Sequence, residues 1–312
     1  IMTSPLLPEG LRDRLPPQAE SASRVTRALL DQLKSHGYER VAPPLAEFRE
    51  TLDSDGAGRD LLRFTDPVSQ RTLAIRPDIT TQIGRIATSR MAHAARPLRL
   101  SYAGQVVKLK ASQLRPEREM LQVGAEIIGN DSVAAAREIV GVALAALKAA
   151  GVSGITIDFT LPDLVETLAG STLPLPANKV ARVRAELDAK DAGALAALGA
   201  HAYLPLIAAA GPFHQALARL QQIDGGGDLA SRITALETIA ADLDADITVT
   251  LDPTERHGFE YQSWFGFSLF AAGKVAALGR GGTYAIDANG EVATGFSLYP
   301  DALFDGGAAD SE

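Results

Sequence analysis

The chain has 312 residues, of which 46% are hydrophobic and 22% charged, and its formal net charge at pH 7 is −8. This composition is typical of a globular protein with enough chain to bury a core. An acidic chain has no overall positive field for a phosphate backbone, which argues against a dedicated nucleic-acid binder. The absence of cysteine excludes disulfides, thiolate nucleophiles and cysteine-ligated zinc.

The first residues of the chain carry no basic stretch followed by an apolar run, so no signal peptide is predicted. The alanine-rich stretch 133–150 contains Arg137, Glu138 and Lys148, so no membrane span is predicted either. We therefore expect a cytoplasmic protein that does not bind membranes. The five histidines are scattered along the chain, and we expect neither a metal site nor a cofactor.

The first half of the chain alternates helical and extended patterns. Residues 18–36 carry apolar side chains at helical spacing and end at Gly37, which predicts a helix. A short strand is predicted at 38–41, before two prolines. A second short strand at 72–75 precedes a helix that we expect to open at Asp78. The remaining elements predicted in this half are strands at 98–108 and 119–128, joined by a polar loop, and a helix from 131 to 151.

The second half contains a long helical block. After a strand at 155–159, residues of about 162–244 are rich in alanine and leucine and are interrupted only by proline and glycine. Strands are predicted again at 247–251, at 259–270 and from 293. Strand-rich segments on both sides of a helical block predict one α+β domain, spanning 1–312, with a helical insertion.

The strand Glu119–Ile128 carries the most informative pattern. Its apolar side chains alternate with Gln122, Gly124 and Glu126, which therefore share one face. Such a polar and small stripe could border a cleft in which the glycine leaves room for a ligand. The alternative, which this stretch alone favours, is a half-exposed strand whose polar face meets solvent.

Three further segments are polar enough to contribute to a site. Asp78 follows Arg76-Pro77 at a predicted helix start, where an aspartate is most often a simple cap. The run 257–262 places polar residues before an aromatic strand that by default belongs to the core. The segment 279–282 (Gly-Arg-Gly-Gly) lacks the Lys-Ser/Thr of a phosphate-binding loop, so we expect a tight hairpin turn there.

Taken in order, short motifs over nearly the whole chain resemble the catalytic domain of histidyl-tRNA synthetase. The resemblance implies a class II aminoacyl-tRNA synthetase-like antiparallel sheet flanked by helices. Each motif alone is weak, and their common order makes the resemblance specific. The matching segments are residues 7–13, 41–47 (resembling motif 1, the dimer interface of that family), Arg76-Pro77-Asp78-Ile79-Thr80, Gln122-Val123-Gly124-Ala125-Glu126, Gly258-Phe259-Glu260-Tyr261, Gly281-Gly282-Thr283-Tyr284 and Gly295-Phe296-Ser297-Leu298.

Departures from the family pattern fall on the positions that handle ATP. Adenylation needs arginines on the phosphates and on the developing charge of the transition state. Lys108 stands at the arginine of motif 2, Ala302 at that of motif 3, and His257 at the histidine-specific arginine, whose charge only Arg256 beside it could replace. Losing even one such charge typically costs about a hundredfold or more in rate, so with three lost we expect no useful adenylation and no enzyme activity. The sequence also ends near Glu312, and we expect no anticodon-binding domain.

A synthetase-like chain that lacks these arginines resembles the regulatory subunits of ATP phosphoribosyltransferase, the first enzyme of histidine biosynthesis. The resemblance implies a short-form catalytic subunit as partner, a homodimer within a hetero-octamer, and feedback by L-histidine. Carried over residue by residue, it places a histidine-like pocket at Asp78, Gln122, Glu126 and Tyr261, beside His257. Carboxylate acceptors suit an ammonium and an imidazole, and a tyrosine hydroxyl can orient the ring.

Two other functions stay open at this point. An active class II synthetase-like enzyme would adenylate an amino acid despite Lys108 and Ala302, and would exchange pyrophosphate. A tRNA-sensing module would need a basic patch, for which the only promising local cluster is Lys108, Lys110, Arg115 and Arg118. A charged loop is usually solvated, so this last function is the least favoured.

Overall fold

The computed structural model describes residues 7–52, 61–110, 116–256, 262–286 and 290–304. In chain order its elements are α1 (Gln18–Ser35), β1 (Glu39–Arg40), β2 (Ala46–Phe48), α2 (Arg49–Leu52), β3 (Leu62–Thr65), β4 (Thr72–Ile75), α3 (Thr80–Ser89), β5 (Leu98–Val107), β6 (Glu119–Ile128), α4 (Val133–Ala149), β7 (Ile155–Thr160), α5 (Leu164–Ala169), α6 (Ala177–Asp188), α7 (Ala192–Ala197), the 3₁₀ helix η2 (His201–Ala209), β8 (Gly211–Pro212), α8 (Phe213–Ile223), α9 (Ala230–Ala240), β9 (Thr248–Leu251), β10 (Gln262–Ala271), β11 (Gly279–Ala285), β12 (Val292–Leu298) and α10 (Asp301–Phe304).

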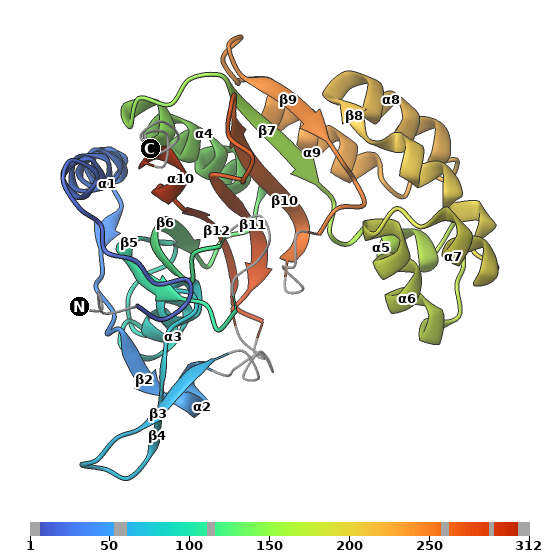
Figure 1. Cartoon of the computed structure of the whole chain (residues 1–312). Coiled ribbons are helices and arrows are strands. Elements are labelled where there is room, and N and C mark those ends of the chain that lie inside the picture. Colours follow the sequence, from blue (N-terminus) through green and yellow to red (C-terminus); the bar gives the residue numbers. More distant parts are fainter. Residues whose placement is uncertain (1–6, 53–60, 111–115, 257–261, 287–289, 305–312) are drawn as a thin grey trace, which may run out of the picture.

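A nine-stranded sheet with the order β1-β5-β6-β12-β11-β10-β7-β9-β8 forms the centre of the molecule (Figure 1). Its strands pair antiparallel from β5 to β7, and the predicted antiparallel arrangement is confirmed for this part. Toward the edges β1 pairs parallel to β5 and β9 parallel to β7, so the sheet as a whole is mixed. Strand β12, the last strand of the described residues, lies between β6 and β11, and it brings the motif at 295–298 beside the polar stripe of β6.

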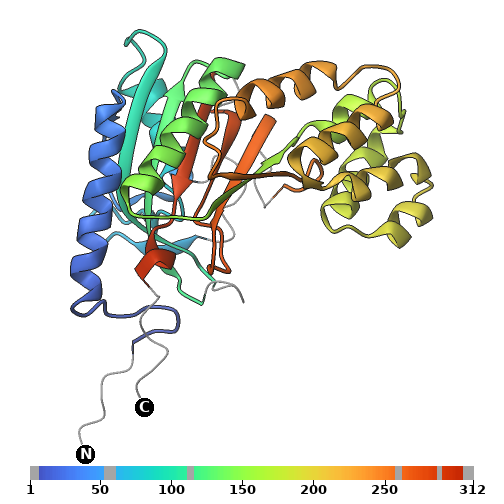
Figure 2. The ribbon, with the colours of Figure 1, turned by 90° about the horizontal axis from the view of Figure 1, so that it is seen from above.

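The two faces of the sheet are covered differently. Helices α1 and α4 run side by side over one face (Figure 2), where the apolar residues of β6 join the main core. Helix α3 covers part of the other face, and Ile79 and Ile83 pack there against Tyr102 of β5. The alternation predicted for β6 is therefore real. Its polar face is not solvated, because Gln122 and Glu126 are 0% and 1% exposed, so the default interpretation of a solvent-facing stripe was wrong.

The hairpin turn predicted at residues 279–282 was also wrong. These residues belong to β11, which is paired on both sides, to β10 and to β12. The glycines are there because the neighbouring strand and its side chains come close. A Cβ on Gly281 would lie 2.5 Å from the backbone oxygen of Gly295 and 2.5 Å from a ring carbon of Phe267. Cross-strand crowding explains this run of glycines better than a turn.

Two parts of the chain stand away from the central sheet. Strands β2, β4 and β3 form a small three-stranded antiparallel sheet that projects from one end (Figure 1). Between β7 and β9 the chain forms helices α5 to α9 and the 3₁₀ helix η2, of which α5 to α8 and η2 lie to one side of the sheet. In the part of the chain that the structure describes, no helix combines the length and the apolar composition that a membrane crossing requires.

Candidate functional site

Asp78 and Gln122 meet where helix α3 approaches strand β6. Asp78 lies two residues before α3, and its Oδ1 accepts the backbone N–H of Thr80 at 2.6 Å. Its other oxygen, Oδ2, accepts from Gln122 Nε2 at 2.9 Å. The aspartate therefore holds the first turn of the helix, as a cap does, and is joined to the strand by the same side chain.

Gln122 of β6 is fixed by partners at the start of α3 and on β12. Its Oε1 accepts the backbone N–H of Ile79 at 2.9 Å, and its Nε2 also donates to Ser297 Oγ of β12 at 2.7 Å. A buried amide with donors and acceptors satisfied keeps one orientation. Gln122 therefore connects α3, β6 and β12 at the floor of the site.

Glu126 is the most unusual group in the site. It is 1% exposed, and its two oxygens accept hydrogen bonds from Tyr102 (3.1 Å) and Tyr284 (2.9 Å). Burial raises the pKa of Glu126 from its ordinary 4.5 to about 8, although the two tyrosine hydroxyls act in the opposite direction. Burial, and then the charge of Glu126, also raises the pKa of Tyr102. A buried carboxyl group with so high a pKa keeps its proton near neutral pH, and a cation or N–H donor placed against it favours the charged form.

Beside Glu126 the structure leaves a cavity of about 20 Å³. A cavity of this size holds roughly one water molecule. Hydroxyl groups, glycines and an arginine surround the carboxylate. The residues that line it are Thr80, Glu126, Gln262, Arg280, Gly281, Gly282, Tyr284, Gly295, Phe296 and Ser297.

Several polar residues of this site were not among the predicted ones. Tyr102 is fully buried and contacts Thr80 Oγ1 (3.1 Å) and Ser297 Oγ (2.9 Å) as well as Glu126. Tyr284 and Ser297 lie within motifs that the sequence analysis quoted, and that was the available signal for them. The contact of Tyr284 with Glu126 and that of Ser297 with Gln122 depend on how β11, β12 and β6 pair, which no local pattern reveals. The other two predicted pocket residues, Tyr261 and His257, lie outside the described residues.

The segments that match the ATP-handling motifs are occupied by structural contacts. Asp301 Oδ2 accepts the backbone N–H of Leu121 at 2.6 Å, and Oδ1 pairs with Arg14. Ala302 packs against the main core. The backbone of Lys108 pairs with that of Arg118, whose Nε also donates to the Lys108 carbonyl at 3.1 Å.

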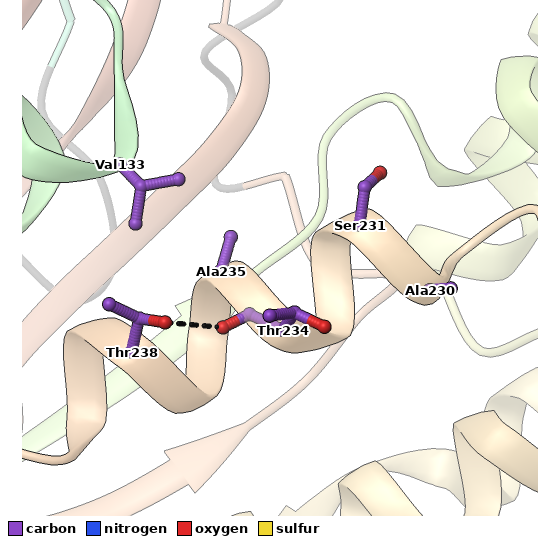
Figure 3. Close-up of a pocket in the computed structure, with 6 residues that line it drawn as sticks. All are labelled: Val133, Ala230, Ser231, Thr234, Ala235 and Thr238. Carbon is purple, nitrogen blue, oxygen red and sulfur yellow. Dashed lines mark hydrogen bonds between the residues drawn. The ribbon is translucent and has the colours of Figure 1, made fainter.

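A second, larger depression of about 600 Å³ lies over α9 and the start of α4 (Figure 3). Its lining is small and uncharged, and the Thr238 hydroxyl is already bonded to the carbonyl of Thr234 at 2.8 Å. It contains no ionisable side chain, in contrast to the cavity beside Glu126. Among the described residues no cluster of His, Asp or Glu could hold a metal ion. The lining residues are Val133, Ala230, Ser231, Thr234, Ala235 and Thr238.

Comparison with known proteins adds a consistent set of relatives. A sequence model of the histidyl-tRNA synthetase family matches residues 10–303. A protein named ATP phosphoribosyltransferase regulatory subunit, from Rhodospirillum centenum, is 45% identical over 96% of this chain and 79% of its own length. A protein of the same name from Paramagnetospirillum magneticum is 43% identical, over 96% of this chain and 80% of its own length.

Solved structures share the fold. A Bacillus halodurans protein described as an ATP phosphoribosyltransferase regulatory subunit/histidyl-tRNA synthetase superimposes with a TM-score of 0.83 at 23% identity, over 100% of this chain and 86% of that one. A chain of the ATP phosphoribosyl transferase (HisG:HisZ) complex from Thermotoga maritima gives a TM-score of 0.70 at 15% identity, over 91% of this chain and 98% of that one. At these identities the likeness shows the fold alone.

Proposed function

Because this chain belongs to the ATP phosphoribosyltransferase regulatory subunits, within the wider histidyl-tRNA synthetase family, we propose that it activates a short-form catalytic subunit and transmits feedback by L-histidine. The observation that carries the proposal is the 45% identity to a regulatory subunit over 96% of the chain. The complex from Thermotoga maritima, one chain of which shares this fold, supports a catalytic partner. A homodimer within a hetero-octamer is the assembly that we propose.

The chain itself does not catalyse adenylation in this proposal. Lys108 and Ala302 replace two arginines that class II synthetases direct at ATP, and a lysine lacks the bidentate fork of a guanidinium. The contacts of Asp301 and Ala302 support this, since both residues are used to join the C-terminal helix to the sheet. An adenylating enzyme, the alternative function, is not favoured.

The site around Glu126 is proposed to bind the imidazole or ammonium of histidine. Glu126 supplies the buried carboxylate, while Asp78 and Gln122 hold the adjoining end of α3. An ion or N–H donor that approaches Glu126 stabilises its charged form, which burial disfavours. Tyr261 and His257 remain proposed members of the same pocket.

Reconstitution tests the regulatory role directly. A short-form catalytic subunit is assayed for ATP phosphoribosyltransferase activity alone, with this chain, and with this chain plus L-histidine. Activation on mixing that histidine reverses is the expected result. The absence of both activation and co-elution would contradict the proposal, and pyrophosphate exchange by this chain alone would establish the alternative.

The pocket is tested separately by calorimetric titration of L-histidine onto the wild type and Glu126→Gln. Glu237→Gln, on the exposed side of α9, is the matched control because it removes a similar charge far from the cavity. Heat is expected from the wild type and the control and not from Glu126→Gln. Equal heats from all three proteins would exclude histidine binding at Glu126.

A further inference from the structure

An irregularity in the pairing of β10 and β11 shapes the cavity beside Glu126. Gln262 is paired with Tyr284, and the next pair is Gly266 with Gly282, so residues 263–265 of β10 face only residue 283 of β11. The Thr283 hydroxyl lies in this bulge, where it accepts from Ser263 Oγ (2.8 Å) and from the backbone N–H of Phe265 (3.2 Å). Bulges of this kind redirect side chains near functional sites.

The same pairing builds a row of glycines beside Glu126. Across the sheet Glu126 is opposite Gly295, Gly295 is opposite Gly282, and Gly282 is opposite Gly266. Paired residues point to the same face, so the three glycines contribute no side chains of their own to a strip of this face, roughly 10 Å long at the usual spacing of strands. The strip starts at the buried carboxylate and could hold an extended small ligand.

Gln262 lies across this strip. Its Nε2 donates to the backbone oxygen of Gly281 at 2.9 Å. A Cβ on Gly282 would lie 2.4 Å from the backbone oxygen of Phe265 and 2.8 Å from Gln262 Nε2, and one on Gly266 would lie 2.5 Å from Thr160 Oγ1 and 2.7 Å from Gln262 Oε1. The carboxamide is therefore the one long side chain that reaches over both glycines, and only about 20 Å³ remains beside Glu126.

We propose that Gln262 is a side-chain gate. Its carboxamide must rotate outward before a ligand of the size of histidine enters along the glycine strip. Pockets for small molecules usually measure several hundred Å³, far more than the space that remains. Gln262 is partly exposed, and within the described part of the chain its carboxamide is held by a single hydrogen bond, to the backbone oxygen of Gly281, so its outward rotation breaks only this bond there. This inference rests on the proposed binding at Glu126 and adds which residue limits it.

The gate has a measurable cost in affinity. When the binding-competent conformation is a minor one, the apparent dissociation constant rises in proportion to its rarity. Removing the carboxamide with Gln262→Ala is expected to tighten the binding of L-histidine about tenfold. Imidazole, which is smaller, is expected to gain less, since it needs only the end of the strip at Glu126.

Calorimetry on the full chain tests the gate with L-histidine and imidazole as probes. The proteins are the wild type, Gln262→Ala, Gln262→Ala with Glu126→Gln, and Gln221→Ala as a control on the exposed face of α8. A gain in Gln262→Ala that the added Glu126→Gln abolishes, with no change in Gln221→Ala, supports the gate. Histidine binding to the wild type that Gln262→Ala leaves equal or weaker overturns it, while the pocket itself stands.

The absence of binding in both the wild type and Gln262→Ala would overturn the pocket and the gate together, and reconstitution with the catalytic subunit would still decide the regulatory role. Thermal unfolding of each variant verifies that it is folded. If Gln262→Ala does not fold, Gln262→Asn keeps the amide but shortens the side chain by one methylene. The same gain in histidine affinity is then required of it.

Discussion

Glu126 and Gly295 are opposite each other on β6 and β12, so close that a Cβ at position 295 would collide with the Glu126 carboxylate. The contact explains why the buried glutamate can reach both tyrosine hydroxyls. It also means that the shape of the site depends on a residue without a side chain.

Gly295→Ala is expected to displace the Glu126 carboxylate, to lower the free energy of unfolding by about 1–3 kcal/mol, as overpacking does, and to abolish the heat of histidine binding. Gly141→Ala is the control, because a Cβ there meets nothing within 4 Å and helix α4 tolerates alanine. Urea unfolding and calorimetry measure both effects. A Gly295→Ala protein with wild-type stability would contradict the contact.

The raised pKa of Glu126 makes stability depend on pH. Between its ordinary value of 4.5 and about 8 the folded protein holds a proton that the unfolded chain has released. The contribution of this group to the free energy of unfolding is therefore complete below 4.5 and is lost as the pH rises toward 8. Glu126→Gln removes this titration, so the wild type should lose stability relative to the variant over this range. Parallel stability profiles in urea would argue against a buried, protonated Glu126.

Asp301 is expected to contribute stability and not catalysis. It is 9% exposed and accepts from the Leu121 backbone and from Arg14, so Asp301→Ala removes the carboxylate that accepts from a buried N–H and pairs with a guanidinium. We expect a loss of about 2–3 kcal/mol, and a smaller one for Asp301→Asn. Asp31→Ala, exposed on α1, should change stability by less than about 0.5 kcal/mol. Chemical denaturation measures all three, and an Asp301→Ala loss no larger than that of Asp31→Ala would contradict this role.

Arg99 and Glu138 form a two-bond ion pair between β5 and α4. Arg99 Nε and Nη2 each donate to a Glu138 oxygen at 2.7 Å, and the Tyr38 hydroxyl donates to the same carboxylate at 2.9 Å. With side chains 36% and 31% exposed, the pair is partly screened by solvent. A double-mutant cycle with Arg99→Met and Glu138→Gln should give a coupling of about 1 kcal/mol that falls at high salt. A coupling near zero would mean that the ion pair makes no measurable contribution to the free energy of unfolding.

The strands of this fold were predictable where their pattern was local. Strand β6 follows from its alternation alone, since apolar and polar side chains change faces at every residue. Strands β2 and β3 were not predicted, because they have three and four residues and are defined by their pairing with β4. The glycines at 279–282 suggested a turn, because sequence does not distinguish a glycine needed for a bend from one needed for a crowded neighbouring strand.

The same limit applies to the site. Asp78, Gln122 and Glu126 were predicted, and the structure brings Asp78 and Gln122 into direct contact. Glu126 lies four residues after Gln122 in β6, on the same face of the strand. Tyr102 and Ser297 complete the network. Tyr102 lies 20 residues before Gln122 in the sequence, and Ser297 lies 175 residues after it. Their meeting depends on strand order, which is set by the fold as a whole.

The position of β12 in the sheet affects how the chain folds while it is being synthesised. Strand β12 lies between β6 and β11, so until residues 292–298 have left the ribosome the sheet has two unpaired edges in its middle. Unpaired edges of this kind invite pairing with other chains. A nascent chain that has made β11 and not yet β12 is therefore most exposed to aggregation, and slow translation between these two strands should burden chaperones more than the same delay earlier in the message.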